Sequence, residues 1–302
     1  MKRSHQHVPA AAAATMVTAV VCMSFLDATS KYLAQQFPPA FVVWVRYCLQ
    51  SLTLIALLGP QLGRRLMVTS SPGLQILRGG ALVTSSLMMV IAFRYLPLAD
   101  ATAINFAAPT LVTVLAVLLL HEHVTFARAI SVTLGMIGLL LIVRPGAGLF
   151  HGAALFALVA AFANASYQIL TRKLAADDSR TMLFYASVVG AIAMSCAAPW
   201  RDVDLARVRI TDVGAMLAMG WLATGGHFLF IRALQRAPAS GLAAFTYLQL
   251  VFATLIGLAW FGNFPDHATL LGMAVITASG AFLTWYERRR AVVQPNVPPA
   301  ID

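Results

Sequence analysis

Apolar stretches of about twenty residues recur along the chain, and they constrain its fold more than any other feature. A helix that crosses a lipid bilayer needs about 20 mostly apolar residues. Prolines, glycines and charged residues separate the stretches. We therefore predict an all-α membrane protein with ten transmembrane helices. The predicted spans are 11–34, 40–58, 74–94, 99–120, 126–143, 151–172, 181–199, 213–232, 239–261 and 267–286.

The composition agrees with a protein embedded in lipid. Hydrophobic residues make up 60% of the chain and charged residues only 11%, whereas soluble proteins carry about a quarter charged residues. The net charge of +10 comes from Lys and Arg spread in ones, twos and threes, so a nucleic-acid partner is not expected. The three cysteines lie far apart in apolar runs, so neither a disulfide nor a metal site is expected.

The placement of basic residues predicts that the tails 1–10 and 288–302 both lie in the cytoplasm. With the N-terminus inside, 14 of the 21 Lys and Arg fall in cytoplasmic segments and 6 in external ones. This is the bias that orients membrane proteins. The external segment near 200–212 runs against the rule, because it holds Arg201, Arg207 and Arg209. A bacterial-type inner membrane is the expected location.

The two halves of the chain, 11–145 and 151–287, match each other at a constant offset of 141 residues. Ser30 aligns with Thr171, Lys31 with Arg172 and Pro97 with Pro238. Identities are sparse, so the shared spacing of the spans supports the repeat as much as they do. Each half holds five predicted spans, so the second must enter the membrane from the opposite side. Inverted repeats of this kind build many secondary transporters, with the binding site between the repeats.

Short motifs in both halves carry a family resemblance. They include Leu77–Gly79, Tyr95–Ile104, Pro109, Ile142–Gly146, Ala237–Ser240, Tyr247–Gln249 and Phe261–Asp266. With these motifs, residues 11–290 resemble the drug/metabolite transporter superfamily of the type with two EamA repeats. Two positions depart from the family pattern, because Asn263 replaces an acidic residue and Leu250 replaces a proline in the ninth span.

Charged residues inside the first two spans are the strongest candidates for a substrate pathway. Asp27 and Lys31 lie one helical turn apart, so they share a face and can pair. Arg46 is expected at a similar depth on the next span. A charge facing lipid costs about 2.5–3.5 kcal/mol, so we expect the three to line the outer part of a polar cavity. Alternatively, Lys31 extends to the interface while Asp27 and Arg46 join two helices. Arg172, which matches Lys31, marks either the other mouth of the pathway or an ordinary cytoplasmic base.

Other side chains at membrane depth complete the predicted pathway. A pocket for an organic solute needs aromatic walls and a few converging polar groups. His227 follows two glycines and titrates near neutral pH in its ordinary state. For each of these residues the alternative is a contact between helices. The candidates are Trp44, Asn105, Tyr167, Gln168, His227, Tyr247 and Gln249.

The resemblance implies a carrier of a small organic metabolite that works by alternating access. The members that the chain resembles most carry riboflavin, S-adenosylmethionine or chelating metabolites, and an amino-acid or drug efflux carrier is the alternative. Lys31 and Arg46 favour a solute with an anionic or carbonyl-rich part. A passive channel would need rings of like polar residues, and an intramembrane enzyme would need a catalytic pair at matching depth. No cofactor is expected; a homodimer is an open alternative.

Overall fold

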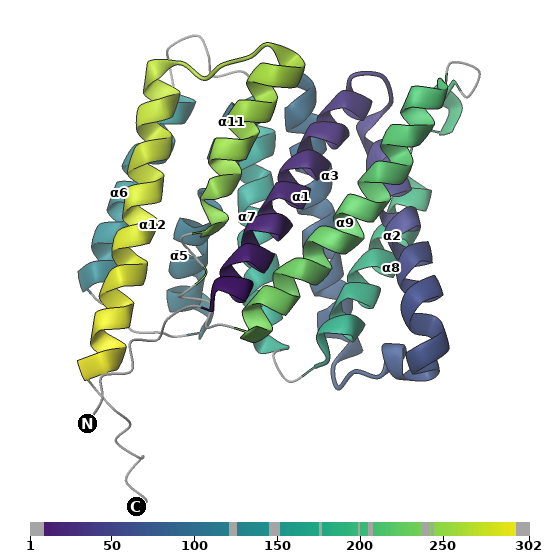
Figure 1. The fold of residues 1–302 in the computed structure, drawn as a ribbon, viewed down its shortest axis with the longest axis horizontal. Helices are drawn as coiled ribbons and strands as arrows, with labels where there is room; N and C mark the ends of the chain where they lie inside the picture. Colours follow the sequence, from purple (N-terminus) through teal and green to yellow (C-terminus); the bar gives the residue numbers. More distant parts are fainter. Residues whose placement is uncertain are drawn as a thin grey trace, which may run out of the picture.

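A computed structural model describes residues 9–120, 126–144, 152–174, 177–198, 200–204, 208–236, 242 and 245–293. In this part of the chain, long helices lie side by side, with α6 and α12 at one end of the molecule and α2, α8 and α9 at the other (Figure 1). Nine described helices are long and apolar enough to cross a membrane, and a shorter apolar helix covers Leu248–Phe261. The predicted all-α membrane fold with ten spans is confirmed.

The described residues of the first half form six α-helices, because the fourth predicted span is divided. A 3₁₀ turn, η1 (Gly63–Met67), follows the second helix. The helices are α1 (Ala10–Ala34), α2 (Pro39–Leu62), α3 (Pro72–Tyr95), α4 (Leu98–Asn105), α5 (Ala108–Leu120) and α6 (Phe126–Val143).

The second half repeats this order, with a 3₁₀ turn, η2 (Trp200–Asp202), before its third long helix. The third and fifth long helices extend furthest beyond their predicted spans, over 210–236 and 267–293, since hydropathy marks the lipid-embedded part of a helix and not its end. In the ninth predicted span the described helix begins only at Leu248, and residues 237–241 and 243–244 lie outside the described residues. The helices are α7 (Gly152–Lys173), α8 (Ser179–Ala197), α9 (Ile210–Arg236), α11 (Leu248–Phe261) and α12 (His267–Val293).

Prolines explain where several helices begin and where the fourth span breaks. Pro39 and Pro72 are the first residues of α2 and α3, and Pro97 precedes α4. Proline suits a first turn because it has no N–H group and a fixed φ angle. Pro109 interrupts the fourth span, since its ring would clash with the carbonyl of Asn105 four residues earlier, where α4 ends.

The packing of the helices shows that the two halves are related by a pseudo-two-fold axis. At the offset of 141 residues, α1, α2, α3 and α6 correspond to α7, α8, α9 and α12, and α4 with α5 corresponds to the span that contains α11. The pair α3–α7 is matched by α9–α1, and α3–α8 by α9–α2. The self-matched pairs α2–α8 and α6–α12 also pack together, and α4 contacts α11, which joins the fourth span to the ninth. The predicted inverted repeats are thereby confirmed.

The contact between α6 and α12 shows this axis at the level of residues. Ser131 Oγ lies 2.9 Å from Ser279 Oγ. A methyl group added to Gly138 would lie 2.9 Å from the carbonyl oxygen of Gly272. Because Ser131 aligns with Gly272 and Gly138 with Ser279, the two contacts are equivalent across the axis. Small residues allow the two backbones to approach this closely.

Candidate functional site

The ends of the described helices distinguish the two faces of the helix layer. Helix α1 begins and helix α12 ends toward the lower edge in Figure 1, which we call the termini face. The upper edge, where α1 ends and α12 begins, is called the opposite face.

The fourth and ninth spans are interrupted at matching positions. A turn at Phe106 and Ala107 separates α4 from α5, and a turn at Tyr247 precedes α11. Phe106 and Tyr247 are equivalent at the offset of 141 residues, and their ring centroids lie 5.5 Å apart. The two interruptions therefore meet at the pseudo-two-fold axis. Broken helices near such an axis are the usual place of substrate binding in inverted-repeat transporters.

At this meeting point one side chain, Tyr247, is held in place by packing, and another, Asn105, lacks a hydrogen-bond partner. Tyr247 is buried, and any side chain at Gly280 of α12 would collide with its hydroxyl group. Asn105, the last residue of α4, has a buried Oδ1 atom without a hydrogen-bond partner. A buried acceptor left unpaired costs about 1–3 kcal/mol. Asn105 therefore has hydrogen-bonding capacity available beside the broken helices.

Asp27 and Arg46 lie at the same depth on α1 and α2. Asp27 is seven residues before Ala34, and Arg46 is seven residues after Pro39, which is about 10 Å of helix in each case. Gln249 of α11 donates a 2.9 Å hydrogen bond from Nε2 to Asp27 Oδ2. Arg46 interacts electrostatically with the Asp27 carboxylate, yet no ion pair joins these two described residues. The Nε atom of Arg46 is buried without a hydrogen-bond partner.

His227 of α9 belongs to the same centre. Its Nδ1 donates a 2.8 Å hydrogen bond to the carbonyl oxygen of Ala223. The ring also lies within electrostatic reach of Arg46 and Arg78. The structure thus brings four of the predicted residues together around one centre, namely Asp27, Arg46, His227 and Gln249.

Arg78 of α3, which the sequence marked only as part of a family motif, is 3% exposed. Its Nε donates to Thr171 Oγ1 at 2.7 Å, and its two terminal nitrogens donate to the Met182 carbonyl at 3.0 Å and to the Tyr167 hydroxyl at 2.9 Å. The guanidinium also lies 4.5 Å from the centroid of the Tyr167 ring. Arg78 therefore joins α3 to α7 and α8, and it fixes the predicted site residue Tyr167.

The Lys31 ammonium group donates hydrogen bonds to the end of α3 and not to its predicted partner, Asp27. Lys31 is 4% exposed, and its Nζ donates to the carbonyl oxygens of Phe93 at 2.7 Å and Leu96 at 2.6 Å. These carbonyls lie where a helix leaves its last acceptors unpaired, which explains why the ammonium binds there. Asp100 of α4 interacts electrostatically with Lys31, and its Oδ1 is buried without a partner.

Three further predicted residues lie away from the centre formed by Asp27 and Arg46. Trp44 Nε1 donates a 2.8 Å hydrogen bond to Ser195 Oγ of α8, which is a contact between helices. Gln168 is 3.5 Å from Asn164, one turn earlier on α7. Arg172 is exposed at the termini-face end of α7.

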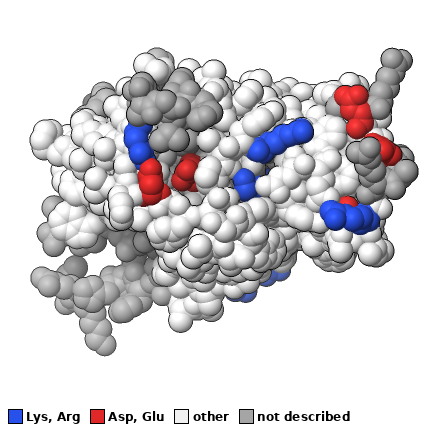
Figure 2. All heavy atoms as spheres, turned by 90° about the horizontal axis from the view of Figure 1, so that it is seen from above, with Lys and Arg blue, Asp and Glu red and all other residues white. Residues whose placement is uncertain are grey.

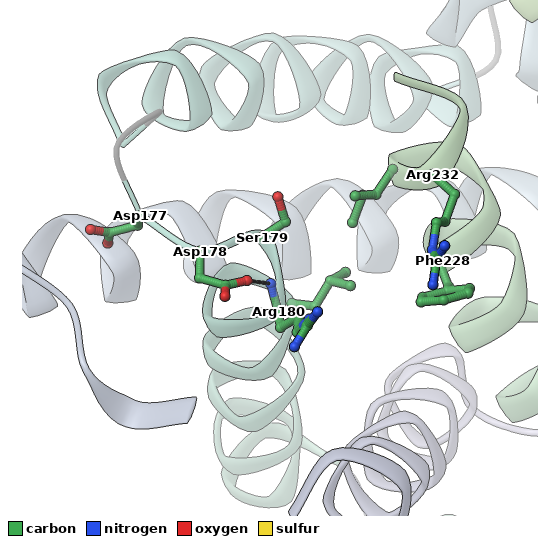
Figure 3. A pocket seen from close by; sticks show the side chains of 8 residues that line it. Asp177, Asp178, Ser179, Arg180, Phe228 and Arg232 are labelled. Atoms are coloured by element: carbon green, nitrogen blue, oxygen red, sulfur yellow. Dashed lines mark hydrogen bonds between the residues drawn. The ribbon is translucent and has the colours of Figure 1, made fainter. Parts of the chain in front are cut away.

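A pocket of about 500 Å³ opens at the termini face, between the start of α8 and the end of α9 (Figure 3). Asp178 caps α8 by accepting a 2.8 Å hydrogen bond from the backbone N–H of Arg180. The Arg232 guanidinium lies 5.1 Å from the centroid of the Phe228 ring. Among the described residues, no group of three His, Cys, Asp or Glu could hold a metal ion. The pocket is lined by Asp177, Asp178, Ser179, Arg180, Leu183, Phe228, Ile231 and Arg232.

The equivalent positions near the opposite face are buried. Asp178 and Ile231 correspond to Phe37 and Val90, which are only 6% and 2% exposed. Phe37 and Val90 belong to one apolar cluster that also includes Val42. The two mouths of the molecule are therefore unequal, with an opening at the termini face and a packed apolar seal near the opposite face.

The opposite face is mostly uncharged, and its acidic and basic side chains meet in a few places (Figure 2). Arg144, after α6, forms an ion pair with Asp266, which also accepts a 2.9 Å hydrogen bond from the Thr269 N–H at the start of α12. The hydrogen bond from Arg144 holds the pKa of Asp266 well below its usual range. Arg209, one of the bases against the orientation rule, contacts Asp212 through its backbone N–H and its side chain.

Comparison with known proteins gives a consistent result. The profile of the EamA-like transporter family matches residues 10–144 and 151–285. A S-adenosylmethionine uptake transporter of Rickettsia bellii is 28% identical over 89% of this chain and 92% of its own length. A riboflavin transporter of Vibrio cholerae is 28% identical over 97% of this chain and 99% of its own. A crystal structure with 19% sequence identity shares the fold, with a TM-score of 0.66 over 93% of this chain and 98% of that chain.

Proposed function

The chain belongs to the EamA-like transporter family, and on that premise we propose that it carries a small organic metabolite by alternating access. The protein is a multi-pass membrane transporter with a small-molecule substrate. In the proposed mechanism, one site near the meeting point of the broken helices is exposed first to one face and then to the other. S-adenosylmethionine and riboflavin, the solutes named for two relatives, are the first substrates to test.

The inequality of the two mouths is the observation that carries this proposal. In an inverted repeat, each half can adopt the conformation that the other half has now. Exchanging the two conformations would expose the positions of Phe37 and Val90 and would bury those of Asp178 and Ile231. The present arrangement thus corresponds to a state open at the termini face. A channel would need both mouths open at the same time, so the packed seal favours a carrier.

The termini face is proposed to be the cytoplasmic face of an inner membrane. The bias of basic residues supports this orientation. The segment near 200–212, with Arg201, Arg207 and Arg209, remains the main exception to that bias. A membrane-impermeant thiol reagent applied to intact cells tests the orientation. In a chain whose three native cysteines are replaced by alanine, it should label a cysteine at exposed Tyr95 of the opposite face and leave one at exposed Arg172 unlabelled.

Cysteine accessibility at two equivalent positions tests alternating access directly. Ile231→Cys and Val90→Cys are placed separately in a chain whose Cys22, Cys48 and Cys196 are replaced by alanine. Without substrate, a water-soluble thiol reagent should label Ile231→Cys much faster than Val90→Cys. A transported substrate should shift the two rates in opposite directions. Rates that rise or fall together would contradict alternation between the two mouths.

Transport itself is measured with the purified full chain in proteoliposomes. Radiolabelled solute should exchange against unlabelled solute inside the vesicles, with and without a pH gradient. A carrier gives saturable counterflow and no unitary currents. Current steps in a planar bilayer would favour a channel, and chemical conversion of the solute would favour an enzyme.

A further inference from the structure

Asp27 and Arg46 are opposite charges that the protein holds near each other without joining them. Both are half-buried, both lie about 10 Å of helix from the opposite face, and the two interact electrostatically. The structure nevertheless shows no ion pair between them. Asp27 accepts a hydrogen bond from Gln249 on Oδ2, and Arg46 Nε has no hydrogen-bond partner. Each charged group therefore keeps bonding capacity that the protein does not use.

The other buried bases of the described chain behave differently. Arg78 uses all three guanidinium nitrogens in hydrogen bonds, and Lys31 donates to two carbonyls. Charges inside a membrane are costly, so they are normally paired or bonded to backbone carbonyls. Arg78 and Lys31 are thus satisfied by protein groups, whereas Arg46 keeps a buried nitrogen that could bond to a ligand.

We propose that Asp27 and Arg46 bind the two charges of a zwitterion, namely the α-amino and α-carboxylate groups of an amino-acid moiety. Arg46 receives the carboxylate, for which a guanidinium is the best-matched side chain. Asp27, held by Gln249, receives the ammonium group. The inference rests on the proposed carrier function and names the substrate class of the same site.

The surroundings of the pair fit a ligand with an amino-acid head and a larger organic body. Gln249 lies two residues after Tyr247, whose ring packs against Phe106 at the two broken helices. Asn105 offers its unpaired Oδ1 as an acceptor in the same region. A neutral solute would leave both charges of the pair unpaired when it displaced water from them, and this cost selects against it.

The test is a binding cycle that combines two ligands with two proteins. The ligands are S-adenosylmethionine and its decarboxylated form, which keeps the amine and the sulfonium group. The proteins are the full chain and Arg46→Gln, measured by equilibrium binding in detergent. Arg46→Gln should weaken binding of S-adenosylmethionine tenfold or more, the effect of losing one charge-assisted hydrogen bond. It should change binding of the decarboxylated ligand less than about twofold, because the group that Arg46 recognises is already missing.

Further variants keep the test independent of folding. Arg46→Lys retains the charge and should recover part of the affinity, whereas Asp27→Asn should weaken every ligand that carries the amine. Arg144→Gln removes a base at the opposite face and should leave binding unchanged. Equal losses for both ligands in Arg46→Gln would overturn the proposal.

Proteoliposome counterflow separates failure of this inference from failure of the carrier function. Exchange of S-adenosylmethionine, or of an amino acid, supports the inference when the binding cycle agrees. Exchange of uncharged riboflavin without exchange of any zwitterion would overturn the inference and leave the carrier function intact. The absence of exchange for riboflavin, S-adenosylmethionine and all common amino acids would overturn both.

Discussion

Arg78 on α3 and Met219 on α9 occupy equivalent positions in the two repeats, yet their surroundings have opposite chemistry. Arg78 donates to the Tyr167 hydroxyl, to Thr171 and to a backbone carbonyl, which makes a polar joint between α3, α7 and α8. Met219 is fully buried, and its sulfur lies 3.5 Å from the hydroxyl of Ser30, the residue equivalent to Thr171. One packing geometry is therefore built once with a charge and once without.

The residues around Met219 complete this contrast. Leu26 and Phe41, equivalent to Tyr167 and Met182, are buried in one apolar cluster with Met219. The polar joint adjoins the open pocket, since Met182 precedes the lining residue Leu183. The apolar joint lies within the seal near the opposite face. Two repeats with the same fold are therefore held together by different forces, by hydrogen bonds near one mouth and by apolar burial near the other.

Placing an arginine at the apolar joint around Met219 should have the largest effect on stability. Met219→Arg puts a guanidinium among Leu26 and Phe41, which offer it no hydrogen-bond acceptor from their side chains. An unpaired charge at membrane depth costs about 2.5–3.5 kcal/mol, so we expect a large loss of folded protein, measured by fluorescence-detected size exclusion in detergent. Met219→Leu, of similar volume, should cost less than about 1.5 kcal/mol. A Met219→Arg protein as stable as the parent would show that the two joints are interchangeable.

Removing the charge from the polar joint should have the next largest effect. Arg78→Met leaves the Tyr167 hydroxyl without the guanidinium that donates to it, and we expect the free energy of unfolding to fall by about 1–3 kcal/mol for the unpaired groups. The double variant Arg78→Met with Tyr167→Leu copies the composition around Met219. It should be more stable than Arg78→Met alone, as seen in the midpoint temperature of unfolding. Additive losses would mean that an apolar joint cannot be built on this side.

The sequence predicted the packing plan of this molecule better than its side-chain partners. Runs of apolar residues located the ten spans. The fourth span was predicted as unbroken over 99–120, although Pro109 stands where the structure divides it. Nothing comparable marks the break at Tyr247, because Leu250 stands where Pro109 would repeat. Asp27 and Lys31 share a helix face by their spacing, yet this spacing does not say which neighbouring helix either residue will contact.

Partners from distant parts of the chain explain most of what the sequence missed at the site. Lys31 binds the carbonyl of Phe93, 62 residues away, and Arg78 binds Thr171, 93 residues away. Such contacts depend on helix packing, which a local pattern does not encode. The sequence also did not predict that the two mouths are unequal. The repeat shows which residues are equivalent, but it does not show which of two equivalent residues is buried.

Asp177 and its equivalent Gln36 precede α8 and α2, and they differ in charge. This difference predicts a pH dependence of stability in one repeat only. Asp177 accepts hydrogen bonds from Thr69 and Gln75, and the bond from Thr69 is the main cause that lowers its pKa. A lowered pKa means that the folded state favours the carboxylate, so this stability is present at neutral pH and is lost as the pH falls below about 4. Asp177→Asn should cost about 1 kcal/mol at pH 7 and should flatten the acid branch of a thermal melting profile. Its equivalent, Gln36, has no charge, so Gln36→Ala should leave that branch unchanged; an unaltered branch in Asp177→Asn would remove Asp177 as its cause.

Removing the ion pair between Arg144 and Asp266 should have the smallest effect on stability. This pair is also specific to one repeat, because the equivalent positions hold the uncharged residues Thr125 and Trp285. The Arg144 and Asp266 side chains are 27% and 50% exposed, and exposed ion pairs contribute about 0.2–1 kcal/mol. Arg144→Gln and Asp266→Asn should each lower stability by no more than that, because Asn retains the cap of α12. The double variant should lose little beyond either single one, and 1 M salt should erase the coupling. A loss of more than about 2 kcal/mol in the free energy of unfolding would exceed the range for an exposed ion pair. The seal near the opposite face would then depend on this charged pair as well as on apolar burial.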